Sequence, residues 1–199
     1  MTNCEGVMCM AHVTTQPLVW IDCEMTGLNT AVDRIIEIAT LITDSELNVL
    51  AEGPELVIHR PPELLEQMND WNRKHHGESG LTARVSASEI EIEAADEMTA
   101  SFIKSYVKHG AAPLCGNSVW QDRRFIDMEM PLTAACLHYR NIDVSSFKEL
   151  ARRWYPNFPH FKKQNHHRAL DDIRESIEEL KYYRKFLMLS EPKPFEENS

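Results

Sequence analysis

Two carboxylates stand two residues apart in an apolar stretch near the start of the chain, Val-Trp-Ile-Asp-Cys-Glu-Met-Thr-Gly from Val19 to Gly27. Because side chains alternate across a β-strand, Asp22 and Glu24 are expected to project from the same face. Carboxylates held that close resist ionising together unless a cation or a shared proton relieves their repulsion. A divalent metal ion, which prefers hard oxygen ligands, would relieve it. The alternative is that both are solvated acids at the end of a strand.

Further acids stand at the expected ends of other elements. Asp122 follows a Gly-Asn-Ser turn, and Asp171 and Asp172 begin the last predicted helix. Each alone is explained by the preference of acids for the first turn of a helix. With the pair on the strand, Asp122 and either Asp171 or Asp172 make four carboxylates, about the charge that two Mg²⁺ or Mn²⁺ ions need at a scissile phosphate. The combination therefore indicates a two-metal phosphodiesterase.

Such chemistry also needs a group that accepts the proton of the attacking water, and an imidazole that titrates near neutrality suits this role. Two His/Asp pairs have the same spacing, His166 with Asp171 and His167 with Asp172. Helical phase does not separate them, since both aspartates lie about equally far from the apolar stripe of the last helix. The residues alone leave this choice open.

Composition limits the class of protein. The chain has 199 residues, of which 43% are hydrophobic, and this suits one well-buried α/β domain. Its 31 acidic and 21 basic residues give a net charge of −10, which disfavours a long duplex nucleic acid held by a broad basic surface. The five cysteines show no Cys-x-x-Cys spacing, so neither a disulfide framework nor a structural zinc site is expected. No apolar run approaches the ~20 residues of a membrane span.

Both ends of the chain are predicted to be disordered tails, residues 1–17 and 190–199, around one domain from 18 to 189. The first tail lacks Arg and Lys, so it resembles neither a secretory signal nor an Arg-rich organelle presequence. Because no disulfide framework is expected, a reducing compartment is favoured. The absence of Arg and Lys from the first tail favours the cytosol, with the nucleus and the mitochondrion as alternatives.

Hydrophobic periodicity predicts the elements that position these residues. Strands are expected over 19–25, 35–43, 47–58, 113–117 and 140–144, with a polar loop over 26–33. Helices are expected over 61–71, 88–110 with Ser88 and Glu91 as a capping box, 121–130, 132–138, 147–154 and 169–189. The stretches 72–88 and 155–165 are expected to be irregular. Spacing alone makes Trp71 a core anchor of the first helix. The order of elements predicts an α/β fold with a mixed sheet and helices on its faces.

Longer motifs occur along the chain at Trp20–Leu28, Asp33–Thr40, Leu50–Pro54, Cys115–Ser118, Gln121–Phe125, His138–Arg140, Asp143–Ser146, Lys148–Trp154 and His167–Ser176. Their residues and order resemble the oligoribonuclease family, the short-RNA branch of the DEDDh exonucleases. The resemblance covers residues 18–187 and implies an RNase H-like fold. It also implies a dimeric 3′-to-5′ exoribonuclease that cuts very short RNA, particularly dinucleotides, to 5′-mononucleotides with two divalent ions, Mg²⁺ or Mn²⁺.

The resemblance assigns roles by position. Asp22, Glu24, Asp122 and Asp172 match the family's metal-binding acids, and His167 matches its general base. The family order thus separates the two His/Asp pairs. It also reverses the expectation for Trp71, because stacking on a base is sequence-tolerant and worth ~1–3 kcal/mol. The implied substrate contacts are Leu28 and Trp71 beside the bases, Asn117 and Ser118 near the substrate with His76 close by, and Tyr139, Arg140 and Ser145 over the 5′ end, across the interface of a homodimer.

The chain departs from the family pattern at Cys23, where a larger aliphatic residue is more usual, and at Trp120, which adds a bulky ring. Residues 155–165 do not align, so Lys162 and Lys163 receive no role. Two rival functions remain: an exonuclease of the same superfamily that acts on longer RNA or on DNA 3′ ends, and a binding module that keeps the fold without catalysis.

Overall fold

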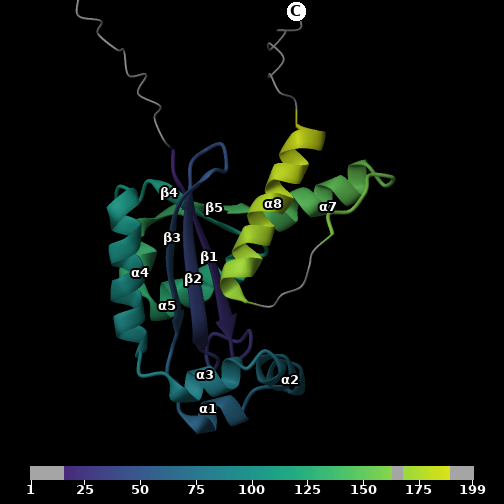
Figure 1. The fold of residues 1–199 in the computed structure, drawn as a ribbon. Helices are drawn as coiled ribbons and strands as arrows, with labels where there is room; N and C mark the ends of the chain where they lie inside the picture. The colour runs from purple at the N-terminus through teal and green to yellow at the C-terminus, as the bar shows by residue number, and fades with distance from the viewer. Residues whose placement is uncertain (1–15, 163–167, 189–199) are drawn as a thin grey trace, which may run out of the picture.

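The computed structural model of the protein describes residues 16–162 and 168–188. Its centre is a mixed sheet with the strand order β3-β2-β1-β4-β5 (Figure 1). The strands are β1 (Leu18–Met25), β2 (Ile35–Thr43), β3 (Val49–Val57), β4 (Ala112–Gly116) and β5 (Leu137–Asp143). The β1, β2 and β3 strands form an antiparallel meander, while β4 pairs parallel with both β1 and β5. The predicted mixed sheet with flanking helices is confirmed.

Helices cover both faces of the sheet and close one of its ends. They are α1 (Pro62–Glu66), α2 (Asp70–Glu78), α3 (Leu81–Ala87), α4 (Ile92–Tyr106), α5 (Trp120–Glu129), α6 (Pro131–Cys136), α7 (Val144–Trp154) and α8 (Ala169–Leu187). Helix α4 lies on one face and α8 on the other, while α1, α2 and α3 gather below the end of β1 (Figure 1). The last predicted helix is confirmed to within two residues of its end.

Alternation along β1 decides which way its acids face. Val19, Ile21 and Cys23 are buried in the core that α4, α5 and α6 share. Trp20 is buried in the second core, which includes residues of α7 and α8. Asp22 and Glu24 are in phase with Trp20 and therefore face the α8 side of the sheet.

The irregular stretch predicted over 72–88 is wrong, because α2 and α3 occupy most of it. The residues that α2 buries are Asn72 and His76, one helical turn apart, so its inward face is polar and leaves no apolar stripe in the sequence. Trp71 belongs to this helix and not to the one that begins at Pro62.

Other boundaries also differ from expectation: the strand expected over 140–144 begins at Leu137, and the helix expected over 147–154 begins at Val144. The helix expected from Ser88 begins at Ile92, and the Ser88 hydroxyl donates to the carbonyl of Val57 and accepts from the N–H of Ile90 instead of closing a capping box. The helix expected over 132–138 ends at Cys136, because the chain enters β5 there.

Several predicted features fall on residues that the structure does not describe. The two tails do so except at residues 16–17, as do Lys163, His166 and His167. Among the helices of residues 16–162 and 168–188, none combines the length and the apolar character that crossing a bilayer requires.

Candidate active site

Three acids from the two ends of the domain meet beside the sheet. Asp22 and Glu24 on β1 and Asp172 in the first turn of α8 each offer a carboxylate oxygen, and these oxygens all lie within 4.8 Å of one another. All three residues are half-buried. Because like charges at this separation repel strongly, the group favours a proton or a divalent cation. Carboxylate oxygens are the ligands that Mg²⁺ and Mn²⁺ prefer, so this donor set fits such an ion.

The repulsion within the group affects the pKa of Glu24. Burial, and then the charges of Asp172, Glu37 and Asp122, raise the pKa of Glu24 from 4.5 to about 7. Without a cation, this carboxyl is partly protonated near neutral pH. Carboxyl groups whose pKa is raised because no cation neutralises them are typical of a metal site.

Asp122 lies beside the group rather than within it. Its Oδ1 accepts the backbone N–H of Cys23, the residue between the two β1 acids, at 3.0 Å. On β1, the residues that pair with β4 are Val19 and Trp20. Beyond them, Asp122 on α5 accepts the Cys23 N–H in place of a neighbouring strand. Burial raises the pKa of Asp122 to about 7, against the lowering effect of the Cys23 N–H. The Cys23 side chain is buried in the opposite core, so this departure from the family pattern leaves the acidic face unchanged.

A buried acid that the sequence did not single out as functional stands next to Glu24. Glu37 on β2 is its cross-strand partner, and it is 1% exposed. Burial raises the pKa of Glu37, whereas the Arg84 guanidinium, 2.5 Å away, lowers it. Arg84 on α3 thus neutralises Glu37 locally.

The geometry distinguishes the two candidate aspartates of α8. Asp172 joins the β1 acids, whereas Asp171 pairs with Arg174 at 3.2 Å. Arg174 also binds Glu52 on β3 at 2.9 Å. The two candidate histidines precede α8 and lie outside the described residues, so the pairing of histidine with aspartate stays a prediction.

Helix α2 is attached to the end of β1 through its polar face. The Nδ2 of Asn72 donates to the carbonyl of Thr26 at 2.7 Å, and the Nε2–H of His76 donates to the carbonyl of Met25 at 3.0 Å. The other ring nitrogen of His76 lies 4.0 Å from Glu24 Oε2. Burial lowers the pKa of His76, so its neutral form is favoured. Asn72 was not predicted, because a single asparagine in a polar stretch carries no signal in sequence.

Large apolar side chains are exposed around this end of the sheet. Leu28 is 60% exposed and Trp71 is 62% exposed, so the core interpretation of Trp71 is wrong. The ring of His75 stacks on the indole of Trp71 with centroids 3.8 Å apart. Trp120 on α5 is also exposed, with the Arg124 guanidinium 5.7 Å from its ring centre.

A hydrogen-bonded cluster joins the end of β4 to the start of α7. Ser118 has a left-handed backbone, with φ of 53°, and its N–H donates to Asp143 Oδ1 at 3.0 Å and to Ser145 Oγ at 2.9 Å. The Ser145 hydroxyl donates to Asn117 Oδ1 at 3.1 Å. The resemblance implied that Asn117 and Ser118 lie near the substrate and that Ser145 lies over its 5′ end, and the structure brings the three residues together.

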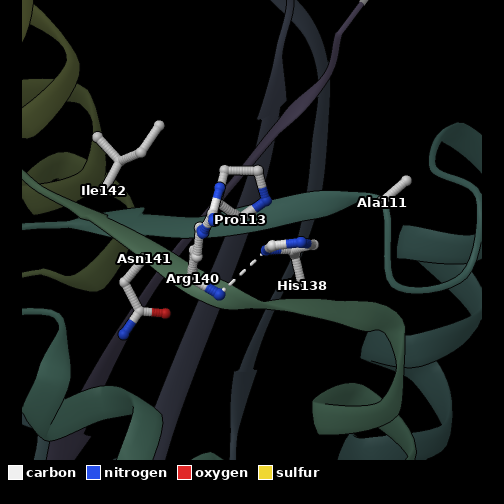
Figure 2. Close-up of a pocket in the computed structure, with 6 residues that line it drawn as sticks. All are labelled: Ala111, Pro113, His138, Arg140, Asn141 and Ile142. Atoms are coloured by element: carbon white, nitrogen blue, oxygen red, sulfur yellow. Dashed lines mark hydrogen bonds between the residues drawn. The ribbon is translucent and has the colours of Figure 1, made fainter.

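Tyr139 and Arg140 lie on β5, at the edge of the sheet. Tyr139 is 74% exposed, and the Arg140 guanidinium lies 5.3 Å from its ring centre. Arg140 lines a cavity of about 310 Å³ on β4 and β5 with Pro113 and His138, whose Nδ1 accepts the Arg140 backbone N–H at 3.0 Å (Figure 2). Asp22, Glu24 and Asp172 are not among the residues that line this cavity.

Comparison with known proteins agrees with this geometry. Residues 19–180 match the family model described as Exonuclease, a span that contains β1 except for its first residue and the first turns of α8. The oligoribonuclease of Alcanivorax borkumensis is 59% identical over 168 residues, covering 84% of this chain and 93% of its own length. That of Haemophilus influenzae is 56% identical over 174 residues, covering 87% of this chain and 96% of its own.

Solved structures with the same fold include exonuclease I. The exonuclease I of Methylocaldum szegediense matches with a TM-score of 0.59 and 16% identity over 86% of this chain. A product-bound exonuclease I matches with a TM-score of 0.62 and 15% identity over 86% of this chain. The chain spans only 41% and 44% of those two proteins, so the likeness concerns the arrangement of the sheet and its helices.

Proposed function

The chain belongs to the exonuclease family and to its oligoribonuclease branch, and from that membership we propose that it is a 3′-to-5′ exoribonuclease of very short RNA. Its products would be 5′-mononucleotides, and dinucleotides would be its preferred substrates. The observation that carries the proposal is the convergence of Asp22, Glu24 and Asp172, whose oxygens lie within 4.8 Å of one another. Carboxylates gathered at such a site suit the binding of cations at a phosphodiester.

Asp22, Glu24, Asp122 and Asp172 would hold two divalent ions, Mg²⁺ or Mn²⁺. When bound, such ions supply the positive charge that a scissile phosphate requires and lower the pKa of a bound water. The contribution of the protein is to hold the carboxylates in place. The Cys23 N–H orients Asp122, and the hydrogen bonds of α2 to Met25 and Thr26 support the end of β1.

His167 would accept the proton of the attacking water. Replacement of His167 by Ala should lower kcat by ~10²–10⁴-fold, the usual contribution of a general base, while leaving substrate binding intact. His166→Ala is the matched control and should have a much smaller effect. The opposite ranking would move the role to His166.

The substrate would be held at its bases and at its 5′ end. Leu28 and Trp71 offer exposed apolar surface for the bases. Ser118, Ser145 and Arg140 would surround the terminal phosphate, an anion that a few local groups can bind despite the net charge of −10.

Because Arg140 lines a cavity apart from the acids, we propose that a homodimer completes the site, with Tyr139 and Arg140 near the interface. Tyr139 is well exposed on an edge strand, as a contact to a second subunit requires. Light scattering after size exclusion should give twice the monomer mass of 23.0 kDa. A strictly monomeric and fully active protein would exclude this arrangement.

A length series of 5′-labelled RNAs, incubated with EDTA or with Mg²⁺ or Mn²⁺, tests the function. The dinucleotide should be hydrolysed at least as well as longer oligomers, and only with metal. Faster hydrolysis of long RNA or of DNA would favour the rival exonuclease. Binding without hydrolysis under every metal condition would favour the binding module.

A further inference from the structure

A buried acid on α8 lies outside the predicted chemistry. Glu179 is 1% exposed and stands about two turns beyond Asp172 on the same helix. Donors from several elements face its carboxylate. The Nδ2 of Asn117 lies 3.1 Å from Oε2, the hydroxyl of Tyr183 lies 3.1 Å from Oε1, and the ammonium of Lys148 lies 3.9 Å from Oε1. Burial and the Glu179 charge raise the pKa of Tyr183, so its hydroxyl stays a donor.

This carboxylate determines the orientation of the Asn117 amide. An ionised carboxylate only accepts hydrogen bonds, so the NH₂ group of Asn117 must face Glu179. The same NH₂ group donates to Ser176 Oγ at 2.9 Å, and the Ser176 hydroxyl donates to the carbonyl of Asp172 at 2.8 Å. Both amide protons of Asn117 are therefore used inside the protein, and its Oδ1 points the other way.

The orientation of the Asn117 amide determines which way the hydroxyl groups of Ser145 and Ser118 donate their hydrogen bonds. Asn117 Oδ1 can only accept, so the Ser145 hydroxyl, 3.1 Å away, donates its proton to it. Ser145 Oγ in turn accepts the N–H of Ser118 at 2.9 Å, and the Ser118 hydroxyl lies 3.2 Å away as a further donor. Ser118 is exposed, so this chain of hydrogen bonds runs from a buried charge to the surface.

We propose that Glu179 is a positioning residue that, through Asn117 and Ser145, orients the Ser118 hydroxyl as the donor to the terminal phosphate of a short RNA. This inference rests on the proposed function, because it concerns the subsite for the 5′ end. In the free protein, the Ser118 hydroxyl donates its hydrogen bond to Ser145 Oγ. When substrate is bound, a phosphate oxygen would accept that hydrogen bond instead. Asn117 is then also a positioning residue, since its amide is occupied within the protein.

The test compares two dinucleotides, one with a 5′-phosphate and one with a 5′-hydroxyl, by the ratio of their kcat/KM values. Glu179→Gln can present either an oxygen or an NH₂ group to Asn117, so the direction of the chain is no longer imposed. The ratio should fall about 3- to 10-fold, the effect of one hydrogen bond, with the change in KM for the phosphorylated substrate and kcat nearly unchanged. Glu178→Gln, an exposed neighbour paired with Lys181, is the matched control and should keep the wild-type ratio.

Two further variants separate positioning from a loss of folding. Asn117→Ala, at a half-buried turn, should reduce the ratio as much as Glu179→Gln does. The double variant Glu179→Gln/Ser118→Ala should be no worse than Ser118→Ala alone, because both changes act through the same hydroxyl. Additive losses, or a Glu179→Gln variant with the wild-type ratio, would overturn the inference, as would a wild-type protein that does not distinguish the two dinucleotides. A wild-type protein that hydrolyses neither would instead refute the proposed function.

Discussion

At the scale of single residues, the acidic group combines burial with repulsion. Glu24 faces Asp172 and Glu37 and has a pKa of about 7, and Asp122 has a similarly raised pKa. Glu37 differs because it has a guanidinium partner, Arg84, at 2.5 Å. Glu24 and Asp122, whose pKa values burial raises to about 7, are therefore well suited to an external cation.

The raised pKa of Glu24 predicts a pH-dependent stability of the metal-free protein. Between its ordinary pKa of 4.5 and about 7, the folded state binds more protons at Glu24 than the unfolded state, so this contribution to stability falls as pH rises from about 5 to about 8. Mg²⁺ or Mn²⁺ should restore stability at pH 8, because it binds the folded state. Urea unfolding at several pH values, with EDTA or with metal, measures both effects.

Glu24→Gln is the control for that experiment. His76, whose pKa is lowered from 6.5, acts in the opposite direction, so the difference between wild type and Glu24→Gln isolates the carboxyl. This difference should grow in favour of the variant as pH rises without metal. A difference that is independent of pH would contradict the assignment.

Trp71 presents an open indole surface backed by His75, and this predicts a role in binding. Trp71→Ala should raise KM for a dinucleotide about 5- to 100-fold, since base stacking is worth ~1–3 kcal/mol. Trp154 on α7 is exposed to a similar degree, at 65%, and Trp154→Ala serves as the control with little expected effect on KM. Equal effects of the two changes would argue against stacking at Trp71.

At the scale of elements, sequence patterns located those helices that bury apolar residues. The stripe of Ile173, Ile177 and Leu180 predicted α8 because it packs in the core with Trp20. Helix α2 was missed because Asn72 and His76 form its buried side, and hydrophobic periodicity does not detect a polar interface. Its contacts are hydrogen bonds to Met25 and Thr26, which only the folded sheet brings within reach.

The position of α5, which carries Asp122, depends on a buried ion pair at its other end. Arg60 and Glu129 lie 2.5 Å apart with side chains 12% and 9% exposed, and Glu129 also accepts the N–H of Ile35. Arg60→Ala leaves a buried carboxylate without its cation, so the free energy of unfolding should fall by about 3–5 kcal/mol. Chemical denaturation measures this loss. Arg153→Ala, which removes a solvent-exposed pair with Glu149, is the control and should leave the free energy of unfolding nearly unchanged.

At the scale of the whole molecule, the sequence predicted a mixed sheet with helices on its faces, but it did not predict the detailed arrangement of the site. The meander and the alternation of later helices and strands indicated a mixed sheet. Periodicity could not choose between Asp171 and Asp172, because both lie in the first turn of α8 and only the packing of that helix on β1 separates them. Before the structure, only the resemblance to a family favoured Asp172.

The small number of phosphates on a dinucleotide predicts how its binding to this acidic protein, with a net charge of −10, responds to salt. A dinucleotide with two phosphates engages few cationic groups, so log KM should rise with log salt concentration with a slope of only about 1 to 1.5, at ~0.7 per phosphate. Initial rates at constant free Mg²⁺ and increasing KCl measure the slope. A slope of several units would indicate a long track of phosphate contacts and the rival exonuclease.

Asp22 and Glu24 are near the start of the domain, and Asp172 is in its final helix. During translation, the ribosome therefore synthesises β1 to α7 before the third carboxylate exists. A nascent or prematurely terminated chain that lacks α8 would carry the two strand acids without Asp172. The three-acid group can thus form only after α8 has been synthesised and has packed against β1.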